Sequence, residues 1–226
     1  MIDSIFVKQK AVKLGVDMCN IASVDRFKDA PKGFHPQDIY PECQSVVVFL
    51  SHFPLSSLGC KSLAPYTFIR NMMVKKIEDI TFRLCDELEQ AGAPANPIPC
   101  DEPYEYWDDE KKHGRGILSL KHAGMLAGLG AIGKNTLLTN EDFGNMMWIG
   151  AVLTSIKLES DPMVDYEGCI DGCTQCLEAC PCEALDGTTI IQKLCREASF
   201  SWSPGGGAMY ECNACRITCP NCTGIS

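Results

Sequence analysis

Ten of the fifteen cysteines in this 226-residue chain lie between Cys169 and Cys222. They form two related runs, Cys169-x3-Cys173-x2-Cys176-x3-Cys180-Pro181 and Cys212-x2-Cys215-x3-Cys219-Pro220, with Cys195 alone between them. Closely spaced thiolates that end in Cys-Pro are typical of [4Fe-4S] clusters, because a tight turn reaches several iron corners of one cubane before proline turns the chain away. The spacing therefore predicts two clusters and a role in electron transfer.

In two-cluster ferredoxins, the cysteine that precedes the proline binds the other cluster. Applied to this chain, the rule predicts one cluster on Cys169, Cys173, Cys176 and Cys219, and the other on Cys180, Cys195, Cys212 and Cys215. Cys182 and Cys222 are possible substitutes for an assigned ligand. Paired C-x2-C steps also occur in zinc ribbons, so structural zinc is the alternative, although zinc sites rarely carry Cys-Pro after each pair.

The elements that would position these residues fall into two parts of the chain. The first 160 residues hold only five cysteines, without metal-ligand spacing, and the composition changes near Asp161-Pro162. Domains usually contain about 100 to 200 residues. We therefore predict an α/β cofactor-binding domain over residues 1–160 and a ferredoxin-like domain with two [4Fe-4S] clusters over residues 161–226.

Apolar periodicity and turn residues predict the elements of the first part. They predict helices over 4–14, 66–90 and 118–127, and strands over 17–24, 45–50 and 146–154. The order of the first three elements favours a βαβ-style opening. The prolines between 93 and 103 are expected to break regular structure, and the acidic stretch 101–110 is expected to be a solvated loop.

A glycine-rich turn follows the helix predicted over 118–127. Its glycines, Gly128, Gly130 and Gly133, permit close approach of the backbone to a bulky ligand, and Lys134 adds a positive charge. A large polar cofactor fits such a turn, and a tight turn between packed elements is the alternative. NAD or ATP binding is disfavoured, because both motifs need a preceding strand and Asn135 replaces the Ser or Thr that binds Mg²⁺.

Net charge and hydropathy disfavour several classes of protein. The net charge is −9 without any Lys/Arg run, so nucleic acid is not an expected partner. No apolar stretch approaches the roughly 20 residues of a membrane-spanning helix, and the N-terminus lacks the apolar core of a signal peptide. We expect no membrane association and a reducing cytoplasm. Residues 165–226 contain eight acidic and three basic residues, which suits either a basic redox partner or ordinary solvated surface.

The turn from Ala127 to Leu138, combined with the two cysteine runs and the solitary Cys195, resembles the epoxyqueuosine reductase family, a relative of the reductive dehalogenases. The resemblance extends over nearly the whole chain. It implies a nitroreductase-like α/β domain of the cobalamin-reductase type, joined to a ferredoxin-like module whose two [4Fe-4S] clusters reduce a corrinoid. It also implies that Gly128, Gly130, Gly133, Lys134 and Asn135 border the cofactor cavity.

Three features of the chain depart from the family pattern. Ala131 stands where the family usually has an aromatic residue. The family's catalytic acid falls at about Gly114. Asp108, Asp109, Glu110 or His113 could replace it if the loop shifts, although a solvated loop residue is the commoner role for each, so no catalytic residue is assigned. The chain ends four residues after Cys222, so we expect a short form without the family's C-terminal helical repeats, and tRNA modification is not expected.

The sequence as a whole favours an iron-sulfur oxidoreductase that passes low-potential electrons to a corrinoid, or alternatively a flavin, bound in the α/β domain. Its partner would be a redox protein or a small-molecule substrate. The alternative is a ferredoxin-type electron carrier, or a corrinoid activator or chaperone, without its own substrate chemistry. His122, just before the turn, is a possible axial metal ligand, although a packed or solvated helix residue is the commoner role.

Overall fold

The computed structural model describes residues 2–225, and its centre is a four-stranded sheet in the order β1-β2-β8-β3. These strands are β1 (Met18–Ser23), β2 (Ser45–His52), β3 (Ala95–Ile98) and β8 (Met147–Thr154). Every neighbouring pair in the sheet is antiparallel. The architecture is therefore mixed α/β, as the sequence predicts.

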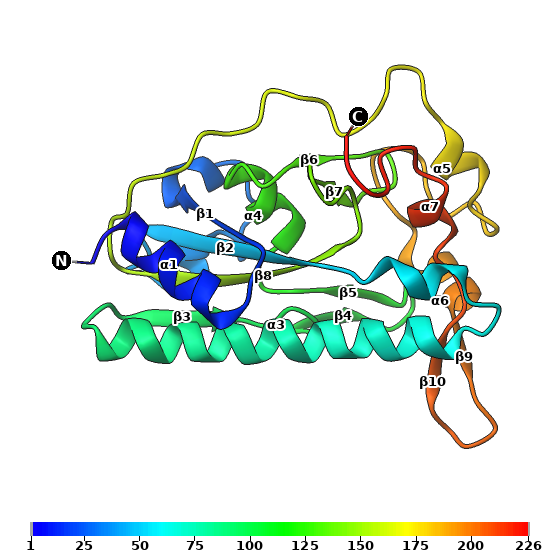
Figure 1. Ribbon diagram of the computed structural model, residues 1–226, viewed down its shortest axis with the longest axis horizontal. Coiled ribbons are helices and arrows are strands. Elements are labelled where there is room, and N and C mark those ends of the chain that lie inside the picture. Colours follow the sequence, from blue (N-terminus) through cyan, green and yellow to red (C-terminus); the bar gives the residue numbers. More distant parts are fainter. Residues whose placement is uncertain (1, 226) are drawn as a thin grey trace.

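Helices cover both faces of this sheet (Figure 1). The helices α1 (Ser4–Leu14) and α3 (Ala64–Gln90) pack on one face, and α4 (Leu120–Leu126) with the 3-10 helix η1 (Val24–Phe27) packs on the other. Along β2, Val47 and Phe49 belong to the core beside α1 and α3, whereas Val48 belongs to the core beside α4. Because both faces are buried, β2 reads as a continuous apolar run instead of an alternating one.

The remaining elements are short. Three two-stranded ribbons pair β4 (Tyr106–Asp108) with β5 (His113–Arg115), β6 (Ala131–Ile132) with β7 (Leu138–Thr139), and β9 (Phe200–Trp202) with β10 (Ala208–Tyr210). The short helices are α2 (Pro36–Ile39), η2 (Leu55–Gly59), α5 (Gln175–Glu178), α6 (Gln192–Ser199) and α7 (Ala214–Ile217). Within residues 2–225, no helix combines the length and apolar character needed to cross a membrane.

The helices and strands predicted in the first part of the chain are confirmed with bounds shifted by two residues at most. The βαβ-style opening is wrong, because β1 and β2 pair in antiparallel orientation, with Cys19 opposite Phe49. The connection between them holds only η1 and the single turn of α2. A parallel pair would need a crossover of about a dozen residues or more, usually a full helix.

Two stretches predicted to be irregular contain strands. The proline-rich stretch forms β3, which pairs only with β8 at an edge of the sheet. An edge position tolerates Pro97, because its missing N–H can face away from the partner strand. The acidic stretch 101–110 includes β4, which pairs with β5.

The cysteine-rich segment lies at the N-terminal end of α3. Residues 155–174 contain no helix or strand and lead from β8 to α5. Figure 1 shows α5, α6 and α7 gathered at this end, with the β9–β10 hairpin projecting past α3. The backbone N–H of Tyr210 donates to Thr67 Oγ1 of α3 at 3.1 Å. The long helix α3 therefore contacts both the sheet and the cysteine-rich segment, while the division at residue 160 stays a prediction.

Candidate iron-sulfur centre and adjoining cavity

Four of the predicted ligands line one small cavity. They form the first cysteine set, which consists of Cys169, Cys173, Cys176 and Cys219. Cys176 lies on α5, and Cys219 follows α7 by two residues. Because α5 and α7 pack against each other, thiols from the two separate cysteine runs meet at this cavity.

The other four predicted ligands also lie near one another. They form the second cysteine set, which consists of Cys180, Cys195, Cys212 and Cys215. Burial raises the pKa of the Cys215 thiol to about 11, Arg216 opposes this shift, and the other three thiols add to it. Thiolates that crowd together repel each other, and bound iron would remove this repulsion. The chemistry of both donor sets fits a cubane cluster.

Backbone N–H groups point at a sulfur atom in each set. Lys134 N–H donates to Cys169 Sγ at 3.2 Å, and Ala184 N–H donates to Cys180 Sγ at 3.3 Å. Such bonds stabilise the thiolate form and, at a cluster, influence the reduction potential. Both sets therefore have a polar environment suited to thiolate ligands.

The two spare cysteines differ from the assigned ligands. The Sγ atoms of Cys180 and Cys182 are 3.8 Å apart. Burial raises the pKa of Cys182, whereas at Cys180 backbone N–H donors outweigh burial and lower the pKa. Cys222 is buried beside Phe53, and burial raises its pKa. These directions favour Cys180 over Cys182 as a thiolate ligand, and Cys222 packs within an apolar cluster.

The thiols do not form a site for one ion. Within residues 2–225, no three Cys, His, Asp or Glu side chains converge on a point where a single metal ion would bind. A cubane needs a different arrangement, because each thiolate binds its own iron corner. The four thiols of the first cysteine set surround a common cavity, which is the arrangement that a cubane requires.

The glycine-rich turn packs against the chain itself. Gly128 has a φ of +75°, and a Cβ there would lie 1.9 Å from the carbonyl oxygen of Pro162. At Gly130, a Cβ would lie 2.3 Å from the carbonyl oxygen of Thr139. Real Cβ atoms do not approach so closely. These two positions therefore require glycine for packing within the protein, whether or not a cofactor binds.

The residues after these glycines contact both cysteine sets. A Cβ at Gly133 would lie 3.4 Å from Cys169 Sγ. Lys134 Nζ donates to the carbonyl oxygen of Cys173 at 2.8 Å, and Asn135 Nδ2 donates to that of Cys215 at 3.1 Å. The turn thus holds the cysteine loops in place. That it also borders a large cofactor stays a prediction.

A cavity of about 420 Å³ lies beside the second cysteine set. Its walls include Arg70 of α3, Asp101 and Glu102, Cys195 and Arg196 of α6, and Tyr210 of β10. The volume is within the range of roughly 300 to 1,000 Å³ that is usual for small-molecule sites. Because Cys195 lines the cavity, a molecule bound there would touch a predicted cluster ligand.

Gly114, where the resemblance predicts the family's catalytic acid, lines this cavity, but none of the four suggested replacements is among the described lining residues. Asp109 is largely exposed and pairs with Lys112. The carboxylates that do line the cavity are Asp101 and Glu102. Sequence reasoning missed them, because they lie in the proline-rich stretch and only the course of the chain after β3 brings them to the cavity.

His122 lies elsewhere, on α4. Its Nδ1 is 2.6 Å from Ser119 Oγ, and it lines a separate, mainly apolar cavity of about 330 Å³ with Phe27 and Phe34. Burial, helped by Lys121, lowers the pKa of His122, so the imidazole is mostly neutral at pH 7. It is not among the described residues that line the 420 Å³ cavity, and its role as a metal ligand stays a prediction.

Comparisons with known proteins identify relatives of this chain. No protein-family model matches the chain. Epoxyqueuosine reductase of Bacillus cereus is 30% identical over 212 residues, which are 87% of this chain and 53% of that protein. The enzyme of Lactococcus garvieae is 34% identical over 113 residues, or 44% of this chain and 31% of that protein.

Solved structures share the fold. Epoxyqueuosine reductase from Streptococcus thermophilus superimposes with a TM-score of 0.67 at 19% identity, covering 98% of this chain and 66% of that one. A reductive dehalogenase whose structure suggests a mechanism for B12-dependent dehalogenation gives a TM-score of 0.56 at 18% identity, covering 80% of this chain and 25% of that one.

The fold is mixed α/β, and the similarity to epoxyqueuosine reductases supports a protein of the iron-sulfur redox class. Within that class, the chain belongs to an epoxyqueuosine reductase-like family. It spans about half the length of the Bacillus cereus relative. The finer description as a nitroreductase-like domain joined to a ferredoxin-like domain stays a prediction.

Proposed function

We propose that this chain passes low-potential electrons from two [4Fe-4S] clusters to a molecule bound in the 420 Å³ cavity. The family relation supports an iron-sulfur redox enzyme. The observation that carries the proposal is the double position of Cys195, which belongs to the second cysteine set and also lines the cavity. An electron that leaves the second cluster thereby reaches whatever the cavity holds.

The contacts between the two cysteine sets support a direction of transfer. Asn135 lines the cavity of the first set and donates to the carbonyl oxygen of Cys215 in the second set. The two clusters would thus be neighbours, separated by Asn135 and adjoining backbone. Only the second set contributes a residue to the 420 Å³ cavity, so the first cluster would receive electrons and the second would deliver them.

A corrinoid is the proposed occupant of the cavity, and a flavin is the alternative. When bound, a corrinoid supplies redox chemistry at cobalt. The chain provides an aromatic wall, since the rings of Phe200 and Tyr210 pack at 4.5 Å between centroids and both line the cavity. Arg70 stacks on Tyr210 at 4.4 Å and pairs with Asp101 at 2.9 Å, so this side of the wall is held in place.

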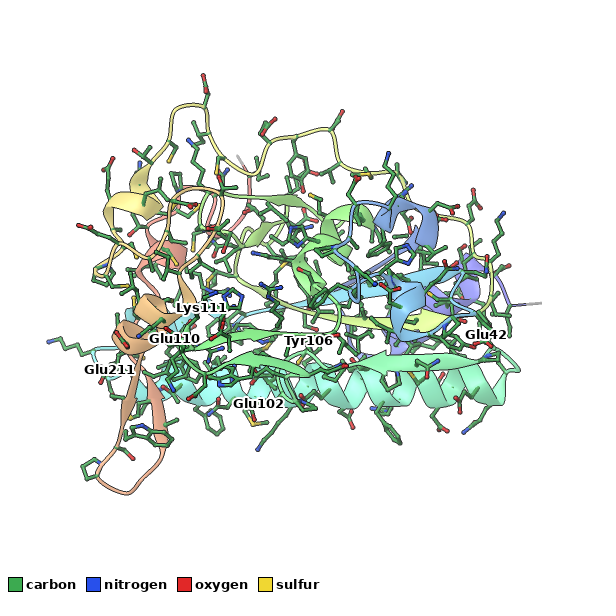
Figure 2. All side chains as sticks on the ribbon, turned by 180° about the vertical axis from the view of Figure 1, so that it is seen from behind. Glu42, Glu102, Tyr106, Glu110, Lys111 and Glu211 are labelled. Atoms are coloured by element: carbon green, nitrogen blue, oxygen red, sulfur yellow. The ribbon has the colours of Figure 1, made fainter. Side chains whose placement is uncertain are left out.

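The acidic net charge of the whole chain favours a small molecule over tRNA as substrate. In Figure 2, Glu110 and Glu211 lie toward the end of the molecule opposite Glu42, with Lys111 beside Glu110. Glu102 lines the cavity, and the whole chain has a net charge of −9. Nucleic acid binding needs cationic side chains that neutralise phosphates. We therefore propose that this member of the family does not act on tRNA.

A second candidate function is electron transfer or corrinoid activation without substrate chemistry. Gly114 favours it, because a glycine lines the cavity where the family has its catalytic acid. Turnover of a reduced substrate without any added partner protein would exclude this candidate.

The proposal is tested by anaerobic titration of the iron-loaded protein with cob(II)alamin, followed by UV-visible spectroscopy, with FMN titrated in parallel. We expect a shift to the base-off corrinoid spectrum. The variant Tyr210→Ala, in the cavity wall, should weaken binding, whereas Trp202→Ala on the projecting hairpin should not. Failure of both cofactors to bind the iron-loaded protein would contradict the proposal.

A further inference from the structure

The long helix α3 exposes an apolar stripe on the side that faces away from the sheet. Along this stripe, Phe68, Met72 and Phe82 are 65%, 45% and 67% exposed. Ile77, on the opposite side of the helix, is fully buried in the core beside the sheet. The β9–β10 hairpin projects past α3 on the same outer side (Figure 1), and its Trp202 is 74% exposed. Large apolar side chains gathered on one exposed face are typical of an interaction surface.

The stripe has the spacing of a helix-packing surface. Exposed residues recur in steps of four and three, in the order Phe68, Met72, Lys75, Asp79 and Phe82. This is the spacing with which one α-helix packs lengthwise against another. The outer face of α3 is therefore suited to contact with a second helix that runs along it.

The middle of the stripe carries opposite charges in a symmetrical order. The basic residues Lys75 and Lys76 come first, and one buried residue separates them from the acidic pair. That pair is Glu78 and Asp79. Among the described residues, neither lysine has an ion-pair partner, and Asp79 has only an exposed pair with Arg83 at 3.4 Å. Exposed pairs of this kind contribute little. A surface that is basic on one side of its centre and acidic on the other is complementary to a second copy of itself turned by 180°.

We propose that the outer face of α3 is the interface of a homodimer, in which the two α3 helices lie antiparallel about a two-fold axis beside Ile77. Lys75 and Asp79 are equally far from Ile77 along the chain, so the axis places each lysine opposite an aspartate of the other copy. Met72 and Phe82 are also equally far from Ile77 and would meet in the same way. Each contact then occurs twice, because a two-fold interface pairs the same patch on both copies.

The size of the contact sets the expected strength of the dimer. The stripe from Phe68 to Phe82 is about 21 Å long and about 10 Å wide, so it covers about 200 Å² on each copy. A stable interface usually buries about 800 Å² per partner. The axis also brings each hairpin to the C-terminal half of the other copy's α3, because the hairpin lies at the N-terminal end of its own α3 (Figure 1). We therefore expect a dimer that dissociates on dilution. It does not depend on the clusters or on the occupant of the cavity.

Sedimentation velocity of the iron-loaded holoprotein tests the proposal, at about 1 µM and about 100 µM. We expect a dimer at the higher concentration, and Phe82→Ser should weaken association at least about tenfold. Met72→Ser and Met163→Ser form a matched pair, because these side chains are 45% and 49% exposed. Met163 lies in the stretch between β8 and α5, away from α3 (Figure 1), so only Met72→Ser should weaken the dimer. Iron content and melting temperature are measured for each variant.

A charge exchange tests the register of the two helices. Lys75→Asp would place like charges opposite each other twice, and it should weaken the dimer about tenfold. The double variant Lys75→Asp/Asp79→Lys restores opposite charges across the axis and should recover the association. A chain that stays monomeric at about 100 µM, or a folded Phe82→Ser variant that dimerises as the parent does, would overturn the proposal. A double variant that associates no better than Lys75→Asp would also overturn it, because association would then not follow this two-fold register.

Discussion

The variant Gly128→Ala tests whether the glycine-rich turn requires glycine for packing within the protein or for the approach of a cofactor. The φ of +75° costs an L-residue about 1–2 kcal/mol. The new Cβ would lie 1.9 Å from the carbonyl oxygen of Pro162, and relieving such an overlap costs about 1–3 kcal/mol. The combined loss is about 3 kcal/mol, which for a chain of this length lowers the melting temperature by about 6–12 °C.

Two further glycines serve as matched controls. Gly15 has a φ of +101°, and a Cβ at this position would have no neighbouring atom within 4 Å, so Gly15→Ala should show only the backbone cost of about 1–2 kcal/mol. Gly205, at the tip of the β9–β10 hairpin, has neither a left-handed φ nor an atom within 4 Å of a Cβ built there. The variant Gly205→Ala should therefore have the same melting temperature as the parent protein.

The assay is thermal unfolding of iron-loaded protein without added corrinoid or flavin, followed by circular dichroism. The reasoning predicts that Gly128→Ala is the least stable of the three variants even though no cofactor is present. If Gly128→Ala unfolds at the same temperature as Gly15→Ala, the contact with Pro162 does not constrain the turn. The glycines would then have to be explained by ligand approach instead.

Three other predictions concern individual side chains. The variant Cys180→Ser should lose about four of about eight irons per chain, which is the content of one cubane. The variant Cys182→Ser should retain all of them. Equal iron loss by both variants would contradict the ligand assignment. The variant Lys134→Met removes the hydrogen bond to the carbonyl oxygen of Cys173 in the first cysteine set. A chelator should therefore extract iron from that cluster about tenfold faster. An unchanged extraction rate would show that this hydrogen bond is dispensable. Burial raises the pKa of Cys19 to about 12, which keeps this thiol protonated at pH 8. Iodoacetamide should therefore modify the exposed Cys60 before Cys19, as followed by mass spectrometry. The reverse order of modification would contradict the burial of Cys19.

The sequence indicates most of the first cysteine set because three of its four members lie close together along the chain. The structure places Cys169, Cys173 and Cys176 around one cavity, and the only distant member is Cys219. The ferredoxin spacing rule supplies that partner, since the cysteine before the proline crosses to the other cluster.

The sequence predicts the cavity poorly because its walls come from distant segments. Arg70, Asp101 and Tyr210 meet there, and no spacing along the chain relates them. The glycine-rich turn shows the opposite difficulty. Its glycines are local and easily seen, but their requirement arises from the carbonyl groups of Pro162 and Thr139, which cannot be found without the packed structure.

The strand topology also depends on long-range pairing. An apolar run such as Val46–Leu50 predicts a buried strand but not its direction. The antiparallel order follows from the absence of a crossover helix between β1 and β2. Pro97 is tolerated because β3 lies at an edge, and only the sheet order shows where the edge is.

The central claim is that the two cysteine sets hold two [4Fe-4S] clusters. The most direct test is to measure iron, acid-labile sulfide and zinc per chain after anaerobic reconstitution, together with the EPR spectrum after reduction. We predict about eight irons and eight sulfides, the content of two cubanes, with the signals of two interacting reduced clusters. Bound zinc without sulfide, or a chain that takes up no iron, would contradict the claim.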